Sequence, residues 1–352
     1  MNTQQIIESG KMIESFKPSP VGIGVLKLDA NENLFLDIEF MKNILVQVAE
    51  ETDPRLYPQV EEEELSQLIA DLNQVNPSQV VVSAGGDQII ELLYSLLERG
   101  SSVAAVTPTF SMYPRTATQR GLVFREATLE PDFSLNIDKT LEVAEGSSIL
   151  VVCNPNNPTG NQFPYDDILK LVEGFNGIVL VDEAYQEYAE YSLVNKIEQY
   201  EKLIILRTFS KAYGAAGLRL GYLITNQKLA STLREKYMTP FPIPNIVLNA
   251  GCRLIKQQEQ VQKVVADTKL ERRWLTEQLN NIKGVKAYPS DANFVLFNIE
   301  KPYKVVYEML KNNGVLVRMI GRVLDKENYL RVTVAPRPIL KRFIDTLEEA
   351  LR

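Results

Sequence analysis

The sequence predicts an α/β protein with two domains: a large domain on a mainly parallel β-sheet, and a smaller α/β domain near the C-terminal end. The chain has 352 residues, more than a single hydrophobic core normally supports. Short β-branched runs alternate with helix-like stretches between about residues 80 and 225. Runs that are apolar on both faces are typical of parallel strands buried between helices. The pattern changes again after residue 282, which indicates a second domain.

Apolar runs mark the expected strands of the large sheet, at residues 80–82, 102–106, 149–152, 178–181 and 203–206. The segments 87–98 and 165–173 between them have helical spacing and acidic starts, and we expect helices there. Ligands bind at the carboxyl ends of the strands in such sheets. Polar motifs directly after these strands are therefore the first place to look for a site.

The C-terminal third has a different pattern. Residues 245–282 contain no proline and repeat apolar residues at helical spacing, which predicts one long helix or two joined helices. Beyond them, expected strands at 294–298, 315–317 and 330–334 alternate with helices near 303–311 and 338–351. We therefore expect an N-terminal segment, 1–30, that joins the small domain, a large domain, 31–245, a linking helical region, 246–282, and a small domain, 283–352.

Charge and composition disfavour several classes of protein. A net charge of −7 disfavours nucleic acid and anionic membranes as partners. No apolar run approaches the length of a membrane span, and the first residues lack the basic flank of a signal peptide, so we expect a cytoplasmic protein. Cys153 and Cys252 are the two cysteines, which fits a reducing compartment.

The chain contains no histidine. This excludes Ser-His-Asp and Cys-His hydrolases and every histidine-ligated metal site, and we expect no metal. Proton transfer must then use lysine, tyrosine or a carboxylate. Lysine suits this task only where its pKa is lowered toward neutrality.

The most informative segment is 207–222, which follows an expected strand and is rich in glycine and alanine. It carries Lys211 beside Ser210, and Arg219 eight residues later. Small residues let a ligand approach the backbone, and the two cations suit a ligand with both a carbonyl carbon and a phosphate. A lone lysine in a glycine loop is usually only solvated, but the surrounding motif outweighs that alternative.

Three further segments follow expected strands. Asp182 and Tyr185 come after 178–181, where a poorly solvated carboxylate needs a cationic partner such as a pyridinium nitrogen. The loop 154–160 offers amides on a turn stiffened by two prolines. The turn 83–88 leads into a helix whose first N–H groups are able to bind a phosphate. Taken singly, each has a plainer alternative. Asp182 could be a helix cap and Tyr185 a packed aromatic residue. The loop 154–160 could be a simple connector, and the turn 83–88 a glycine turn capped by aspartate.

Together these four segments resemble the fold-type I aminotransferases, which depend on pyridoxal 5′-phosphate, and most closely the histidinol-phosphate aminotransferases. The similarity also includes residues 27–33, 55–58 and 330–334, in family order, and so spans nearly the whole chain. It implies a seven-stranded, mainly parallel sheet between helices in the large domain, with a smaller α/β domain at the C-terminal end.

The resemblance also implies roles for individual residues. Lys211 is expected to hold the cofactor as a Schiff base and to move the proton, and Asp182 to pair with the ring nitrogen. Asn157 and Tyr185 are expected to hydrogen-bond the phenolic oxygen of the ring. The other implied cofactor contacts are the backbone amides of Gly86, Asp87 and Gln88, the side chains of Ser210 and Arg219 at the phosphate, Phe110 stacked on the ring, and Tyr57 from a neighbouring subunit.

On the substrate side, the resemblance implies that Arg331 binds the α-carboxylate of the donor, Arg318 a distal anionic group, and Asn33 a further part of the substrate. It also implies a homodimer with shared active sites. The family reaction moves the amino group of histidinol phosphate to 2-oxoglutarate in two half-reactions, giving imidazole-acetol phosphate and glutamate, a step in histidine biosynthesis.

The sequence leaves the amino donor open. It has Pro18-Ser19 where many family members have an aromatic residue after the proline, and Ala335 where glycine is usual after the last strand. An aromatic or broad-range aminotransferase therefore stays an alternative. A pyridoxal-phosphate-dependent decarboxylase of an amino acid phosphate is less favoured, because the segment around Lys211 is closer to that of the transaminases. A regulatory module is disfavoured because no DNA-binding segment fits before Lys27.

Overall fold

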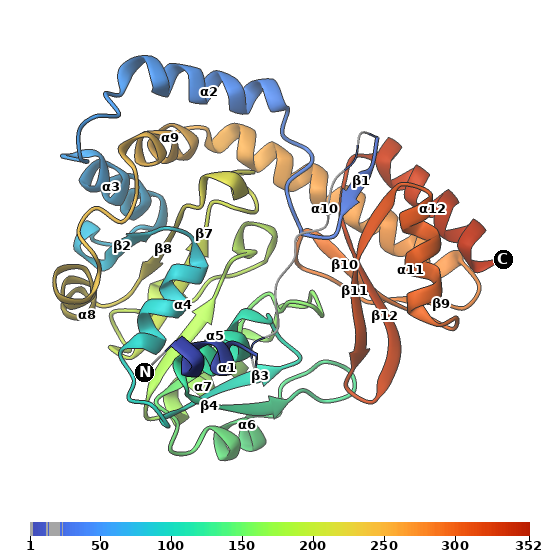
Figure 1. Ribbon diagram of the computed structural model, residues 1–352, viewed down its shortest axis with the longest axis horizontal. Helices are drawn as coiled ribbons and strands as arrows, with labels where there is room; N and C mark the ends of the chain where they lie inside the picture. Colours follow the sequence, from blue (N-terminus) through green and yellow to red (C-terminus); the bar gives the residue numbers. More distant parts are fainter. Residues whose placement is uncertain (1–2, 12, 14–21, 23) are drawn as a thin grey trace.

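The computed structural model describes residues 3–11, 13, 22 and 24–352. Pro18 and Ser19 lie outside the described residues. Two β-sheets, one of seven strands and one of five, form the centres of two lobes that lie side by side in Figure 1. The α/β class, with a mainly parallel seven-stranded sheet, is confirmed.

The large sheet has the strand order β2-β8-β7-β6-β5-β3-β4. Only β8 runs antiparallel to its neighbours, and all other pairings are parallel. The strands are β2 (Val80–Ser83), β3 (Ser102–Thr107), β4 (Val123–Thr128), β5 (Ile149–Cys153), β6 (Ile178–Asp182), β7 (Leu203–Thr208) and β8 (Gly221–Ile224). Strands β4 and β8 were not among the expected ones.

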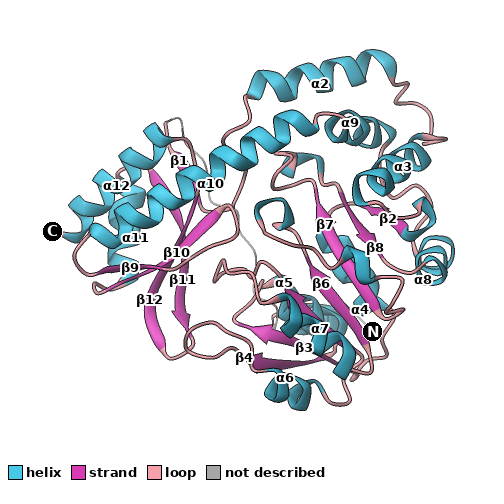
Figure 2. Ribbon diagram, turned by 180° about the vertical axis from the view of Figure 1, so that it is seen from behind, coloured by secondary structure: helices cyan, strands magenta, loops and turns pink. Residues whose placement is uncertain are grey.

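Both faces of this sheet are buried, because alternate residues of each central strand enter different cores. In β5, Leu150 and Val152 belong to one cluster, and Ile149 and Val151 to the other. The first face is covered by α3 (Glu61–Asn73), α7 (Tyr165–Gly174) and α9 (Asn245–Ile255), and the second by α4 (Gly86–Ser95), α5 (Met112–Arg120) and α8 (Gln227–Thr232). The large domain also contains α2 (Ile38–Glu51) and α6 (Ile137–Ala144). The layers are visible in Figure 2.

The expected helical link consists of two helices rather than one. Helix α9 ends at Ile255, and α10 (Gln258–Asn281) begins after a short break and runs across to the small lobe (Figure 1). Among the described residues, no helix has both the length and the apolar character that a membrane span requires.

The small lobe has the strand order β1-β11-β12-β10-β9. Its first strand, β1 (Leu26–Leu28), pairs in parallel with β11, so the chain enters this sheet before it reaches the large domain. The other elements of this lobe are β9 (Val285–Ala287), β10 (Phe294–Ile299), β11 (Val315–Val323), β12 (Lys326–Thr333), α11 (Tyr303–Asn312) and α12 (Arg337–Leu351). One more helix, α1 (Thr3–Gly10), lies at the start of the chain and is not part of this group.

A buried ion pair stabilises the segment directly after β6. Glu183 accepts hydrogen bonds from the guanidinium of Arg207 (2.8 Å), from the Ser192 hydroxyl and from the Leu193 N–H. Both charged side chains are almost fully buried. Removal of one partner would therefore leave an uncompensated buried charge.

We expect Glu183→Ala to lower the free energy of unfolding of the cofactor-free protein by about 3–5 kcal/mol. Denaturant titration measures this loss. The matched control is Glu91→Ala, which removes an exposed partner of Arg120 and should cost less than about 1 kcal/mol. A similar small loss for both variants would contradict the role given to the buried pair.

Candidate active site

The carboxyl ends of the parallel strands meet at one edge of the large sheet. Cys153 at the end of β5 pairs with Asp182 at the end of β6, and Asp182 with Leu206 near the end of β7. This register brings the loops after β5, β6 and β7 together. The end of β6 carries Asp182, and the loops carry the other expected site residues Asn157, Tyr185, Ser210 and Lys211.

Lys211 lies in the loop after β7 and is half-buried. Its Nζ donates to the backbone carbonyl of Ala30 (3.1 Å) and lies 5.6 Å from the centre of the Tyr185 ring. Burial lowers the pKa of Lys211 to about 8, and the positive charge of Arg331 acts in the same direction. A lysine with such a pKa is neutral in an appreciable fraction of molecules near neutral pH, as a base must be.

Asp182 is 4% exposed. Its carboxylate accepts hydrogen bonds from the Ala184 N–H (3.0 Å) and from the Tyr113 hydroxyl. Burial nevertheless raises the pKa of Asp182 to about 6. A carboxylate in such surroundings is stabilised by a cation placed beside it, and a protonated pyridine nitrogen meets that need.

Tyr113 is a site residue that the sequence analysis missed. It lies on α5, is fully buried, and packs edge-on against Phe110 with ring centres 5.7 Å apart. Its position three residues after Phe110, in the first turn of the helix that follows this residue, was the one available signal. A buried tyrosine on a helix is otherwise indistinguishable from ordinary core packing.

Arg331 brings the small lobe into the site. It is 7% exposed, and its guanidinium donates to the Asn157 side-chain oxygen and to the Asp29 carbonyl (2.8 Å). Its Nε is buried and has no hydrogen-bond partner among the residues that the structure describes. Burial lowers the pKa of Arg331 to about 10, and the charge of Arg318 contributes to this shift.

Arg318 lies directly opposite Arg331 in the pairing of β11 with β12, and its side chain is exposed. Like charges at such cross-strand positions repel each other. An anion between the two guanidinium groups would relieve that repulsion.

The opposite end of the site is the start of helix α4. Gly85 occupies the N-cap position, and in the described part of the chain no side chain caps the first N–H groups of this helix. Arg219 lies beside it and pairs with Asp87 at 3.0 Å. A Cβ atom on Gly85, whose φ is +84°, would lie 2.9 Å from the Arg219 guanidinium, and one on Gly221 would lie 3.0 Å from the Gly86 nitrogen. Uncapped N–H groups next to a guanidinium fit a bound phosphate.

The side chains of two other expected site residues, Gln88 and Asn33, contact the protein backbone. The Gln88 side chain accepts from the Ala84 N–H and so closes the turn before α4. The Asn33 side chain bonds the backbone of Phe35 and of Ala212, next to Lys211. Its assignment as a substrate contact stays a prediction.

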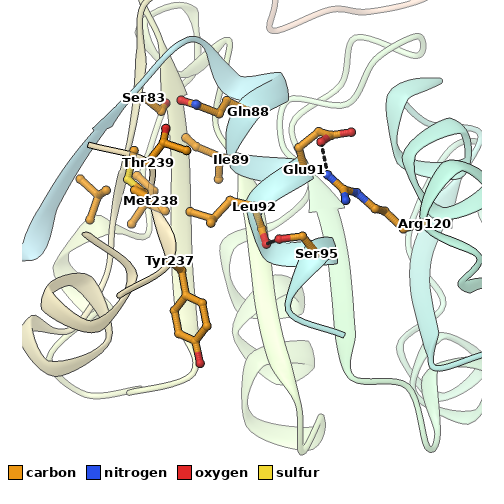
Figure 3. A pocket seen from close by; sticks show the side chains of 12 residues that line it. Ser83, Gln88, Ile89, Glu91, Leu92, Ser95, Arg120, Tyr237, Met238 and Thr239 are labelled. Atoms are coloured by element: carbon orange, nitrogen blue, oxygen red, sulfur yellow. Dashed lines mark hydrogen bonds and ion pairs between the residues drawn. The ribbon is translucent and has the colours of Figure 1, made fainter. Parts of the chain in front are cut away.

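A separate pocket of about 200 Å³ lies between α4 and residues 237–239 (Figure 3). Its lining includes Gln88, Leu92, Tyr237 and Met238. Neither Lys211 nor Arg318 and Arg331 line this pocket, so it is not the place where the expected chemistry would occur.

The chain is similar to known proteins over most of its length. Residues 23–347 match the sequence profile of the family described as "Aminotransferase class I and II". A histidinol-phosphate aminotransferase from Caldanaerobacter subterraneus subsp. tengcongensis is 35% identical over 332 residues, which cover 92% of this chain and 93% of that protein. One from Thermococcus gammatolerans is 34% identical and covers 96% of both.

Among solved structures, a histidinol-phosphate aminotransferase from Sinorhizobium meliloti in complex with pyridoxal 5′-phosphate has a TM-score of 0.86. It is 22% identical in sequence, with 93% of this chain and 91% of that one covered. The fold is therefore that of the fold-type I pyridoxal-phosphate-dependent enzymes. The chain belongs to the class I and II aminotransferase family.

We expect Asp182→Asn to raise the melting temperature of the cofactor-free protein above about pH 6. The folded state raises the pKa of Asp182 from 3.8 to about 6, so the wild type loses stability relative to the variant as pH rises through that range. Toward pH 4 most of the difference should disappear, because the wild-type carboxyl is then protonated in the folded state and only partly ionised in the unfolded state. Thermal melts between pH 4 and 8 measure this.

The control is Asp132→Asn. Asp132 is exposed, and hydrogen bonds from Ser134 hold its pKa below its ordinary value, so this variant should show no gain at neutral pH. A pH-independent difference between wild type and Asp182→Asn would contradict the assignment.

Proposed function

We propose that this protein is a cytoplasmic, homodimeric enzyme that binds pyridoxal 5′-phosphate and moves the amino group of histidinol phosphate to 2-oxoglutarate. The names and the identity of the relatives support this donor. The observation that carries the choice within this chain is the pair of arginines, Arg318 and Arg331, on neighbouring strands.

Histidinol phosphate has no α-carboxylate, so its dianionic phosphate would lie at Arg331 and Arg318, in place of the carboxylate that the resemblance implies for Arg331. Arg331 is buried and has an unpartnered Nε, and Arg318 is its cross-strand neighbour. A phosphate monoester offers enough acceptors and charge for both residues, since guanidinium binds phosphate through paired N–H groups. An aromatic amino acid would offer its α-carboxylate to Arg331, but its side chain would leave Arg318 without an anion. The carboxylates of 2-oxoglutarate offer the same pair of arginines an anion in the second half-reaction.

The residues present fit pyridoxal phosphate. The α4 amides of Gly86, Asp87 and Gln88, together with Ser210 and Arg219, would hold its phosphate, and Asp182 would keep its ring nitrogen protonated. Asn157 and Tyr185 would hydrogen-bond its phenolic oxygen, and Phe110 would pack on the ring. When bound, this cofactor supplies an electron-withdrawing ring that stabilises negative charge on the donor carbon.

The chain itself supplies the proton transfer. Lys211, which would hold the cofactor covalently until the donor replaces it, is the group whose neutral Nζ takes the proton from the donor carbon. Its lowered pKa suits this role at neutral pH, and the chain has no histidine to compete for it.

We expect histidinol phosphate to be the preferred amino donor with 2-oxoglutarate as the acceptor. Its kcat/KM should exceed that of histidinol by at least about 100-fold, because the analogue without phosphate leaves buried Arg331 N–H groups unpaired. Phenylalanine, tyrosine and aspartate complete the panel, and glutamate formation measures turnover.

Product analysis on this panel decides between the functions. Faster turnover of phenylalanine or tyrosine would identify an aromatic or broad-range aminotransferase, and carbon dioxide release without an oxo-acid would identify a decarboxylase. Arg318→Gln should reduce the preference for the phosphorylated donor.

Borohydride reduction should attach the pyridoxyl label to Lys211, and a label on any other lysine would overturn its role.

An exposed aromatic pair supports the shared active site. Tyr57 is 74% exposed and stacks on Phe241, which is also largely exposed, with ring centres 4.8 Å apart. Leu56 and Val60 beside it are exposed as well. Apolar side chains gathered in this way on a surface are typical of a site that contacts another protein. A second copy of the chain would cover them and receive Tyr57.

Mixing two inactive or impaired variants tests this arrangement. We expect Tyr57→Phe subunits and Lys211→Ala subunits to form heterodimers in which one site has both defects and the other has neither. Activity should therefore recover in half of the heterodimer sites. If Tyr57 serves its own chain, every site keeps one defect. A mixture that stays inactive, with heterodimers shown to form and Tyr57→Phe shown to be impaired alone, would refute the shared site.

A further inference from the structure

Residues 29–31 form the crossing from the small lobe to the large one, directly after β1. This short segment contacts three separate site residues, each through a different one of its own residues. The contacts are Asp29 carbonyl to Arg331 (2.8 Å), Ala30 carbonyl to Lys211 (3.1 Å) and Asn31 side-chain amide to Tyr185 (3.0 Å). Two of them use the backbone, and only the contact of Asn31 depends on the identity of the side chain.

Asn31 is held tightly by the small lobe. It is 1% exposed, its N–H donates to the Thr333 hydroxyl (3.0 Å), and its carbonyl accepts from the Asn293 amide (3.0 Å). Its φ is +55°, a region that asparagine and glycine tolerate better than other residues. The ends of β10 and β12 thus fix where the Asn31 amide points.

The direction of the bond to Tyr185 matters for the chemistry of that phenol. A tyrosine hydroxyl has one proton to donate and lone pairs that accept. The Asn31 Nδ2 donates to the Tyr185 oxygen and so uses one lone pair. The proton of Tyr185 is then left for a different acceptor. The ring itself is fixed by Phe294, which packs edge-on at 5.2 Å.

We propose that Asn31 is a positioning residue that directs the Tyr185 proton toward the phenolic oxygen of the cofactor. This inference rests on the proposed binding of pyridoxal phosphate. Because Asn31 is anchored by the small lobe, Tyr185 is set in this orientation only when that lobe is seated against the large one.

Two substitutions at position 31 separate positioning from packing. Asn31→Asp keeps the shape and tolerates the same φ, but its carboxylate accepts the Tyr185 proton and so reverses the hydrogen bond. Asn31→Gly keeps the backbone conformation and removes the amide. We expect the dissociation constant of pyridoxal phosphate to rise about fivefold for Asn31→Gly, the weight of one hydrogen bond, and by more than about tenfold for Asn31→Asp.

Both effects should depend on Tyr185. In a Tyr185→Phe background, each substitution at position 31 should change cofactor affinity by less than about twofold, since the group through which it acts is absent. The melting temperature of each cofactor-free variant, measured alongside, shows whether it folds. The control is Asn328, another asparagine with positive φ, whose side chain bonds the Tyr303 N–H. Asn328→Asp should leave cofactor affinity unchanged.

The outcomes are distinct. If the wild type binds no pyridoxal phosphate, the proposed function fails and this inference fails with it. If the wild type binds but Asn31→Asp and Asn31→Gly bind equally well, or if their losses persist in the Tyr185→Phe background, the role of Asn31 alone is overturned.

Discussion

The rest of the site depends on the buried guanidinium group of Arg331 and its contacts. It joins the two lobes through Asn157 and Asp29, and its charge helps to lower the pKa of Lys211. A cation held at this depth needs hydrogen bonds and a nearby anion to offset its lost hydration. The side-chain oxygen of Asn157 and the carbonyl oxygen of Asp29 accept these hydrogen bonds. The Nε atom of Arg331 has no partner among the described residues. The site is thereby prepared for an anionic ligand before one arrives.

At the other side of the site the buried charge is negative instead of positive. Asp182 is a buried carboxylate whose pKa is raised to about 6, so the fold is less stable with this residue ionised than with it neutral. Tyr113 and the Ala184 N–H compensate only in part. A ligand with a cationic ring nitrogen and an anionic tail would satisfy Asp182 at one point and the α4 N-terminus at another. Local instability of this kind is common where binding has to be selective.

The sequence was sufficient wherever the physical cause is local. Runs such as 149–152 and 203–206 are apolar on both faces, and this property alone distinguishes buried parallel strands. Polar residues directly after such strands must gather at one sheet edge, so Lys211 and Asp182 were identifiable as neighbours. Strand β4 was not predicted because it lies at the edge of the sheet and, of its side chains, only that of Ala127 is buried. Strand β8 was not predicted because it has only four residues, and the first two belong to the glycine-rich segment 207–222.

The sequence by itself thus determined the class of fold, the family resemblance and the residues that follow the strands. Tertiary structure alone decided which distant groups touch them. The bond from Tyr113 to Asp182 spans 69 residues, and the bond from Asn31 to Tyr185 spans 154. The choice of these partners depends on how helix α5 packs and how the small lobe is seated. Periodicity and local motifs carry no information about such contacts, because they arise only when separate elements bury their surfaces against each other.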